Sequence, residues 1–304
     1  MRISPLTLLP LLISGECIAG DWEIKTDLKI TDGAVSDVTK YKTGGAFDER
    51  EVKQKEKTKL ETLLVYSDET PFDGLKYNLR LGNIIEQNRE TKVELNEDGS
   101  IHKNKSRTET ERINYAGIGF SYKIKNILGA NRWSVKGRYD HYFDIHYGAK
   151  DLQANAKERS GSLKGNEWSV KATGEYETFL NTLFFSPYLK FKQEQRDAWI
   201  DDIRLKQQEE EKEKETEIGL AFDWIPPLAG WELNAGPYWQ NEVDYERSPG
   251  ENWARKDDER WIAEIKAEYE AAASGFEIEI VFAQHLNGED QGERQLNLEL
   301  SYEF

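Results

Sequence analysis

The feature that most constrains this chain is an alternation of apolar and polar residues that recurs along its length. In the last ten residues, QLNLELSYEF, every second residue from Leu296 to Phe304 is apolar and the residues between are polar. Because successive side chains of a β-strand point to opposite faces, the pattern predicts a strand with one apolar face. Twelve such segments can be counted, and no stretch holds a helical period long enough to compete. They cover 22–30, 58–66, 75–85, 114–122, 133–143, 168–176, 183–191, a stretch ending at 224, a stretch beginning at 231, 261–269, 276–282 and 295–304.

The charge on the polar faces decides which face meets water. Nearly every segment carries Lys, Arg, Glu or Asp there, and a buried core cannot hold dozens of ionised groups at several kcal/mol each. Twelve strands also enclose more space than inward side chains fill. The apolar faces should therefore turn outward to lipid. The sequence predicts a transmembrane antiparallel β-barrel of about 12 strands, with short periplasmic turns and long extracellular loops.

Aromatic residues support this orientation because they gather at the ends of the apolar faces, as at a membrane interface. Short and long connections also alternate along the chain, which is typical of an outer-membrane barrel. A lower level near the short turns comprises Trp22, Tyr66, Tyr122, Trp133, Tyr176, Trp224, Trp231, Tyr269 and Phe304, and a sparser upper level comprises Phe143, Trp168, Trp239 and Trp261.

Composition narrows the classes further. The net charge of −16 argues against a nucleic-acid partner, and the mean hydropathy of −0.78 argues against a helical membrane span. Residues 1–20 have the pattern of a secretory signal peptide, which leaves 21–304 as a single barrel domain. Cys17, the only cysteine, lies in that leader. A lipoprotein cleavage at Cys17 is the weaker alternative because Glu16 precedes it.

Several positions do not fit a regular alternation. Pro187 and Pro237 lie inside predicted strands, and local bulges are expected to absorb them. A parity break at Ile113 and Tyr115 predicts a bulge in 114–122. The acidic run at 209–215 is interpreted as a strand extending past the membrane, with a short helix as the alternative. The long segments 30–54 and 86–107 are expected to fold inward and constrict the lumen.

The ending LNLELSYEF, the strand count and the rhythm of the connections resemble the small monomeric porins of Gram-negative bacteria. The resemblance is to the oligogalacturonate-specific porin family, which includes sialic-acid porins. It implies a narrow channel that passes acidic oligosaccharides along basic residues. It also implies that Tyr302 and Phe304 form the terminal signal read by the barrel-assembly machinery.

Parity assigns charged residues to the channel wall, and their distribution predicts a field across the lumen. The predicted basic lining is Lys76, Arg80, Arg132, Lys136, Arg138, Lys171, Lys190 and Lys192. The predicted acidic lining is Glu217, Glu232, Glu264, Glu268, Glu277, Glu279 and Glu299. Because the acidic side is large and lysines outnumber arginines, a lumen without a chosen solute is an equal alternative to selection of an acidic sugar.

The histidines of the chain are the candidates for an enzymatic site. His141 has outward parity, but Phe143 occupies the position where barrel phospholipases carry serine. Asp144 and His146 match the Asp-x-His pair of outer-membrane proteases, with Asp201 and Asp202 as conceivable partners, but that pair is weak evidence. His102 and His285 are isolated. No catalytic residue, metal site or cofactor is predicted.

The sequence thus predicts a monomeric porin in the outer membrane of a Gram-negative bacterium. It would pass ions and small hydrophilic solutes, oligosaccharides among them, and would contact outer-membrane lipid and lipopolysaccharide. A protease-like barrel enzyme and a loop-based adhesin are the alternatives.

Overall fold

The computed structural model describes residues 21–33, 36–41, 47–151, 154–178, 180, 182–199, 208–247, 252–271, 274–288 and 291–304. The predicted signal peptide, residues 1–20, lies outside this part. All the strands belong to one antiparallel sheet. They are β1 (Asp21–Asp32), β2 (Ser36–Tyr41), β3 (Phe47–Glu69), β4 (Leu75–Leu95), β5 (Ile101–Ile127), β6 (Ala130–Asp151), β7 (Ala154–Glu177), β8 (Leu183–Trp199), β9 (Gln208–Trp224), β10 (Trp231–Arg247), β11 (Ala254–Ala271), β12 (Phe276–His285) and β13 (Arg294–Glu303).

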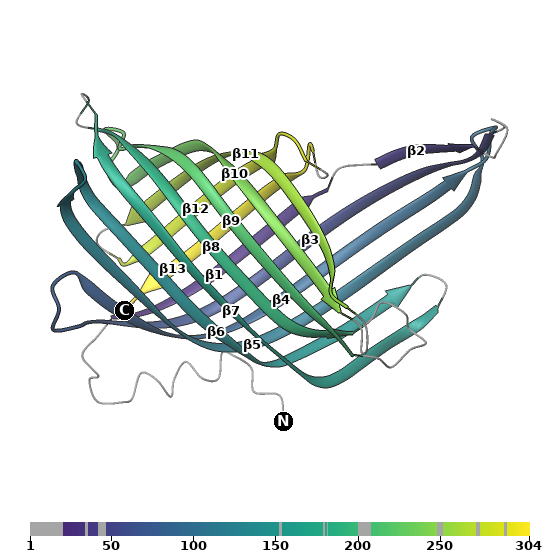
Figure 1. Cartoon of the computed structure of the whole chain (residues 1–304), viewed down its shortest axis with the longest axis horizontal. Coiled ribbons are helices and arrows are strands. Elements are labelled where there is room, and N and C mark those ends of the chain that lie inside the picture. The colour runs from purple at the N-terminus through teal and green to yellow at the C-terminus, as the bar shows by residue number, and fades with distance from the viewer. Residues whose placement is uncertain are drawn as a thin grey trace.

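The sheet closes on itself through β1, which pairs with β13 on one side and with β3 on the other. Twelve strands form the ring, and β2 pairs with β3 beyond it (Figure 1). The prediction of a 12-stranded antiparallel barrel is confirmed. In the described part of the chain no helix is long and apolar enough to cross a membrane.

The first and last strands show how side-chain parity sets the register. Leu28 of β1 lies opposite Leu298 of β13 and Leu60 of β3, so the apolar faces of the three strands coincide. Asp27, the preceding residue of β1, points to the inside of the barrel and lies opposite Glu299 of β13 and Glu61 of β3. A shift of one residue would turn every side chain of the shifted strand to the opposite face, and the alternation therefore fixes the pairing. The Phe304 amide donates to the Trp22 carbonyl at 2.9 Å, so both ends of the ring meet at the short-turn end.

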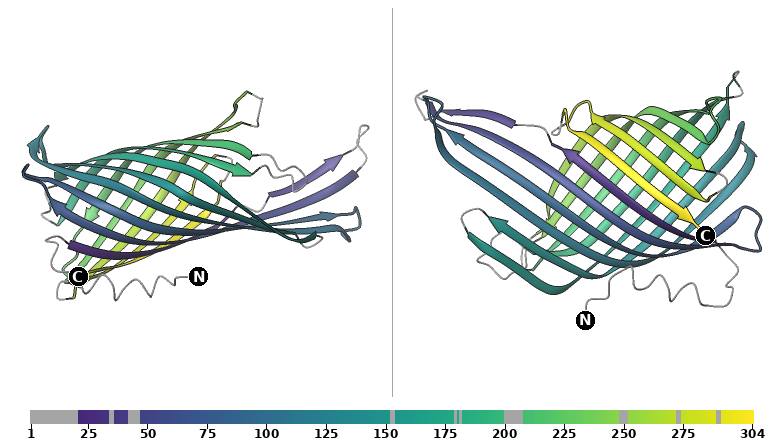
Figure 2. Two further views of the ribbon diagram at one scale, coloured as in Figure 1. Left: turned by 90° about the horizontal axis from the view of Figure 1, so that it is seen from below. Right: turned by 180° about the vertical axis from the view of Figure 1, so that it is seen from behind.

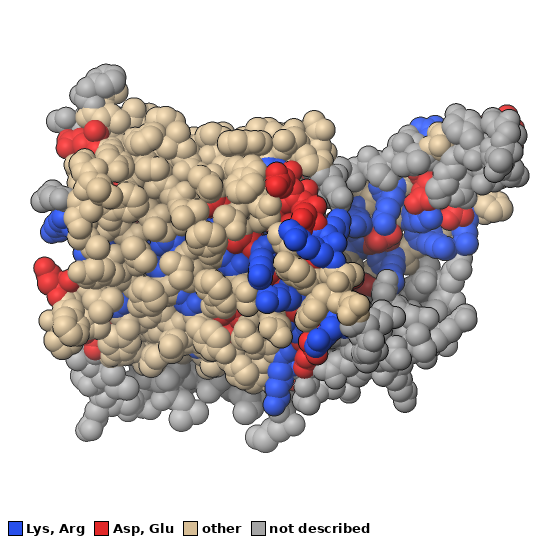
Figure 3. All heavy atoms as spheres, viewed as in Figure 1, with Lys and Arg blue, Asp and Glu red and all other residues tan. Residues whose placement is uncertain are grey.

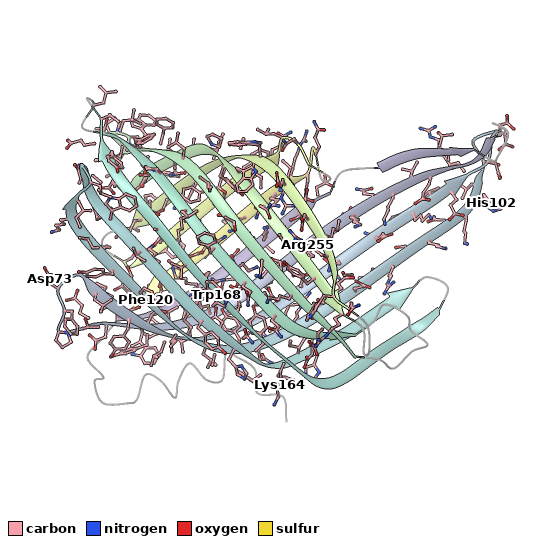
Figure 4. The ribbon with its side chains drawn as sticks, in the orientation of Figure 1. Asp73, His102, Phe120, Lys164, Trp168 and Arg255 are labelled. Carbon is pink, nitrogen blue, oxygen red and sulfur yellow. The ribbon has the colours of Figure 1, made fainter. Side chains whose placement is uncertain are left out.

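The long connections are mostly strand. β3 to β7 run far past the predicted segments, and the turn between β4 and β5 needs only 96–100. These strands and β2 extend beyond one side of the barrel as a polar sheet (Figures 1 and 2). Figure 4 places Asp73, in a short turn, and His102, near the tip of β5, at opposite ends of the molecule. The expectation that 30–54 and 86–107 fold into the lumen is wrong, because their described residues pair as strands instead.

The outer face of the ring is apolar and carries aromatic contacts between neighbouring strands. Near the short turns the ring centroids of Trp22 and Tyr66 are 5.1 Å apart, and those of Trp231 and Tyr269 are 5.3 Å apart. Uncharged residues cover most of the barrel wall in Figure 3, and charged side chains gather at its long-connection edge and on the sheet that extends past it. This is the distribution required of a wall that meets lipid.

The two strand prolines are accommodated without bulges. Around Pro187 the β7–β8 ladder omits pairs but keeps its register, with Thr173 opposite Tyr188 and Tyr176 opposite Phe185. The β9–β10 ladder does the same around Pro237, and Gly236 lies close against the backbone of β9 there. The predicted bulges are therefore wrong. Beside Pro237, Gly236 lets the backbones of β9 and β10 approach closely, so no extra residue is needed there.

The parity break near Tyr115 has a different origin from the one expected. β5 keeps one register with β4 throughout this region, and the shift lies in β6, where Phe143 is an extra residue. The bulge predicted in β5 is thus in its neighbour. Ile113 and Tyr115 keep inward parity and belong to a buried cluster inside the barrel. The cluster comprises Leu63, Val65, Ile84, Ile113, Tyr115, Tyr142 and Ile145.

Candidate channel lumen

A cavity of 1530 Å³ lies inside the barrel. Its lining begins near the short turns, at Lys76 and Lys123, and reaches Arg196 and Glu246 toward the long-connection end. Most of the lining side chains have the inward parity of their strands, which carries many charged residues while the outward parity is mostly apolar. The inside of the barrel is therefore a polar passage between the two ends of the strands, narrowed on the β3 to β6 side by the apolar cluster.

The charges along the cavity are close to balance. Among the described lining residues there are 17 Lys or Arg and 15 Glu. The chain as a whole has 41 bases and 57 acids. The acidic excess of the protein is therefore located away from the cavity wall.

Two rows of like charge face each other across the barrel. Lys55, Lys57 and Lys59 occupy alternate positions on β3, and Glu211, Glu213, Glu215 and Glu217 occupy alternate positions on β9; all seven line the cavity. β3 and β9 are six strands apart in either direction around the ring of twelve. They lie on opposite walls, and the rows create an electric field across the passage. Sequence reasoning missed the lysine row, although the run KQKEKTK at 53–59 alternates visibly.

The acidic row is partly neutralised by its neighbour β8. Lys190 Nζ lies 2.8 Å from Glu215 Oε1 and 2.9 Å from Glu217 Oε1. Lys192 Nζ lies 3.2 Å from Glu213 Oε1. Arg196 Nε lies 2.9 Å from Glu211 Oε2. Each glutamate of the row is therefore paired with a cation of β8.

Several inward side chains cross a neighbouring strand to reach a partner. Asp140 of β6 passes over Gly117 of β5 and pairs with Arg80 of β4, with Arg80 Nε 3.2 Å from Asp140 Oδ1. Arg196 of β8 reaches farther, since its Nη1 lies 2.7 Å from Glu111 Oε2 on β5. These bridges tie non-adjacent strands together inside the lumen and reduce the free cross-section.

The residues predicted to line the channel fall into two groups. Lys76, Arg80, Lys136, Arg138, Lys171, Lys190, Lys192 and Glu217 are on the cavity wall. The other predicted residues are not among the described residues that line the cavity: Arg132, Glu232, Glu264, Glu268, Glu277, Glu279 and Glu299. Some of this second group are held in local ion pairs.

Lys266 and Lys25 organise those pairs. Lys266 Nζ lies 2.7 Å from Glu268 Oε2 and 2.8 Å from Glu279 Oε2. Lys25 Nζ lies 3.2 Å from Glu299 Oε1. Two carboxylate triplets in the described part come close enough to share a cation, but no other feature assigns a metal to either. They are Glu213, Glu242 and Asp244, and Glu268, Glu277 and Glu279.

Among the described residues, the histidines considered for catalysis lie at separate places. His146 Nε2 lies 3.1 Å from Asp144 Oδ1, but the β6 bulge turns both residues to the outer face. Asp201 and Asp202 lie outside the described residues. His141 is on the outer face, and His285 is buried inside the barrel at 1% exposure.

Comparison with solved structures identifies the fold. The transport unit of the autotransporter AIDA-I from Escherichia coli has a TM-score of 0.60 at 9% identity, covering 95% of this chain and 91% of that one. An outer-membrane channel from Pseudomonas putida F1 has a TM-score of 0.55 at 10% identity, covering 95% and 97%. No family model and no curated protein matches the sequence. The chain has the fold of outer-membrane barrels, and the resemblance to oligogalacturonate porins finds no support among these structures.

Proposed function

We propose that the protein is a monomeric porin of a Gram-negative outer membrane and that it passes ions and small hydrophilic solutes without catalysing a reaction. The observation that carries this proposal is the 1530 Å³ cavity lined by charged side chains. Groups of this kind keep a passage wet and exchange hydrogen bonds with a moving solute. The barrel fold shared with a Pseudomonas putida outer-membrane channel is consistent with it.

The solute class follows from the two facing charge rows. A sugar presents hydroxyls that can donate to the Glu215 side and accept from the Lys57 side of the passage, so small oligosaccharides are the preferred solutes. An acidic sugar gains contacts on one wall only and meets repulsion on the other. Because the lining is nearly balanced in charge, we expect weak selectivity between small cations and anions.

Purified protein in planar lipid bilayers tests the proposal. Wild-type protein should form discrete conducting channels. Two substitutions on the cavity wall, Lys57→Glu and Glu213→Lys, should shift the reversal potential in opposite directions. An ion passing about 7 Å from either group in water gains or loses about 0.3 kcal/mol after screening. Reversal doubles this and acts oppositely on cation and anion, so the permeability ratio should change roughly fivefold to tenfold.

Lys214→Glu is the matched control. Lys214 is the sequence neighbour of Glu213 but has outward parity, and its ammonium lies over the outer-face ring of Tyr245. The charge change equals that of Lys57→Glu, yet the reversal potential should stay at the wild-type value. Absence of any conductance in the wild type would contradict the proposed function. Equal shifts from Lys57→Glu and Lys214→Glu would contradict the assignment of the lumen.

A further inference from the structure

The bulge in β6 places polar residues on the outer face of the barrel. Below it, Arg138, Asp140 and Tyr142 face inward at alternate positions, and above it Ile145 faces inward and is fully buried. If residues 142–146 alternated regularly, without a bulge, Asp144 would face the lumen and Ile145 would face lipid. Closing a barrel does not require an aspartate and a histidine on the outside. Bulges that re-aim side chains are common at functional sites.

The re-aimed residues form part of a hydrogen-bonded row across three strands. The Asn83 amide donates to Asn114 Oδ1 at 2.7 Å, and the Asn114 amide donates to Asp144 Oδ2 at 3.0 Å. His146 Nε2 lies 3.1 Å from the other oxygen, Asp144 Oδ1. Both oxygens of the Asp144 carboxylate are therefore engaged within the row. Its charge is used to orient Asn114 and His146, whose side chain remains half exposed.

Two cations flank this row. Arg112 of β5 lies opposite His146 in the ladder. Lys164 of β7 lies beside the bulge, because its neighbour Gly165 pairs with Tyr142 of β6. Both side chains are exposed, and within the described part of the chain neither forms a salt bridge. Figure 4 shows Lys164 projecting away from the barrel. Adjacent strands are about 5 Å apart, so β5 and β7 lie about 10 Å apart on either side of β6. The long side chains of Arg112 and Lys164 can span this distance.

The position of the cluster along the strands indicates what it meets. On the outer face Phe143, 45% exposed, lies beside the cluster, and Trp168, 38% exposed, lies farther toward the short turns, opposite Tyr139. Both belong to the upper aromatic level predicted from the sequence, and such rings lie at the depth of lipid headgroups. The cations just above this level are at the depth of the polar groups of the outer leaflet.

We propose that Arg112, Lys164 and His146, supported by Asn114, bind a phosphate group of lipopolysaccharide. A phosphate monoester carries a charge of about −1.5 to −2 near pH 7, and arginine binds it with two parallel hydrogen bonds. Two permanent cations outweigh the single carboxylate of Asp144, so the cluster favours an anion. The outward surface would meet lipopolysaccharide because the long-connection end faces the exterior in an outer-membrane barrel. The inference depends on membrane orientation and is independent of conduction.

Binding of lipid A to the full chain in detergent micelles, followed by native mass spectrometry, tests this site. Wild-type protein should bind diphosphoryl lipid A at least tenfold more tightly than fully dephosphorylated lipid A, which keeps the same acyl chains. The double variant Arg112→Ser/Lys164→Ser should lose this preference. The single variants, each an exposed substitution with little effect on folding, should each lose part of it.

The control is Lys214→Ser/Arg255→Ser, which removes one lysine and one arginine from exposed outward positions on β9 and β11, and it should keep the wild-type preference. Equal losses in the two double variants would mean general electrostatic attraction and would overturn the site. Equal binding of phosphatidylglycerol and diphosphoryl lipid A by the wild type would also overturn it. Bilayer conductance should be unchanged in Arg112→Ser/Lys164→Ser, which separates this outcome from failure of the proposed channel.

Discussion

Replacement of Gly82 by alanine should displace Tyr115 from the inner wall of the barrel. Gly82 of β4 lies opposite Tyr115 of β5, and a Cβ atom at Gly82 would lie 2.5 Å from both Cε1 and the hydroxyl oxygen of that tyrosine. The ring therefore rests on the glycine. In this position the Tyr115 hydroxyl donates to Glu61 of β3, two strands away, and only 1% of the side chain is exposed.

Gly82→Ala should lower the free energy of unfolding in two ways. Overpacking at a close contact typically costs about 1–3 kcal/mol of unfolding free energy. A lost hydrogen bond to a charged acceptor costs about 1.5–3 kcal/mol. Gly82→Ala should thus destabilise the protein by roughly 3–5 kcal/mol. Tyr115→Phe, which removes only the hydroxyl, should show the second of these effects alone. In Gly82→Ala/Tyr115→Ala the overlap disappears, so the effects of the two single changes should not add.

Gly137→Ala provides a control on the other face of the wall. A Cβ there would overlap the ring of Phe120, which is 44% exposed on the outer face and can swing into lipid or detergent. Its expected cost is under about 1 kcal/mol, as for surface substitutions without a special mechanism. Denaturant unfolding in micelles, followed by tryptophan fluorescence, measures all the variants. Equal costs for Gly82→Ala and Gly137→Ala would refute the assignment of inner and outer faces.

Two further predictions concern the ends of the strands. In the β4–β5 turn, hydrogen bonds from the Ser100 hydroxyl and amide hold the pKa of the Asp98 carboxyl below its usual 3.8. A lowered pKa stabilises the turn above about pH 4 and the effect is lost as pH falls, so Ser100→Ala should raise the pKa of Asp98 in an NMR titration. At the other end, Phe304→Ser should reduce the fraction of folded barrel in cells, measured by its heat-dependent electrophoretic shift, because Phe304 is the predicted assembly signal; an unchanged fraction would contradict that role.

The strands inside the membrane could be predicted from the sequence because one physical requirement acts on all of them. A residue such as Leu298 must be apolar where it meets lipid, and its neighbour Glu299 must tolerate water. Apolar and polar residues therefore alternate in every membrane-spanning segment. The outer parts of β3 to β7 carry no such signal. Residues 47–57 are mostly polar on both faces, and the alternating lysines there do not separate an apolar face from a polar one, so hydropathy does not distinguish this strand from a loop.

The positions around the β6 bulge could not be predicted for a different reason. The parity of Ile113 and Tyr115 indicated an irregularity, but a sequence does not show which of two paired strands holds the extra residue. The structure keeps β5 regular and inserts Phe143 in β6. The apolar cluster inside the lumen also departs from the expectation that outward residues are apolar and inward residues are polar. The cluster is tolerated because Tyr115 and Tyr142 bury one another, with ring centroids 6.1 Å apart.

Which inward residues line the cavity depends on how side chains pack across the barrel. The alternation of residues along a strand does not predict this packing. Inward parity correctly describes Glu268 and Glu279, yet both bind Lys266 and lie away from the cavity. The described cavity wall carries 17 bases and 15 acids, so the acidic excess of the chain is not on it. A solute in the passage interacts with those nearby groups more strongly than with distant ones, because salt screens charges beyond about 10 Å at 0.1 M. For the proposed channel we therefore expect ion selectivity to follow the lysine row of β3 and the glutamate row of β9 and not the net charge of −16.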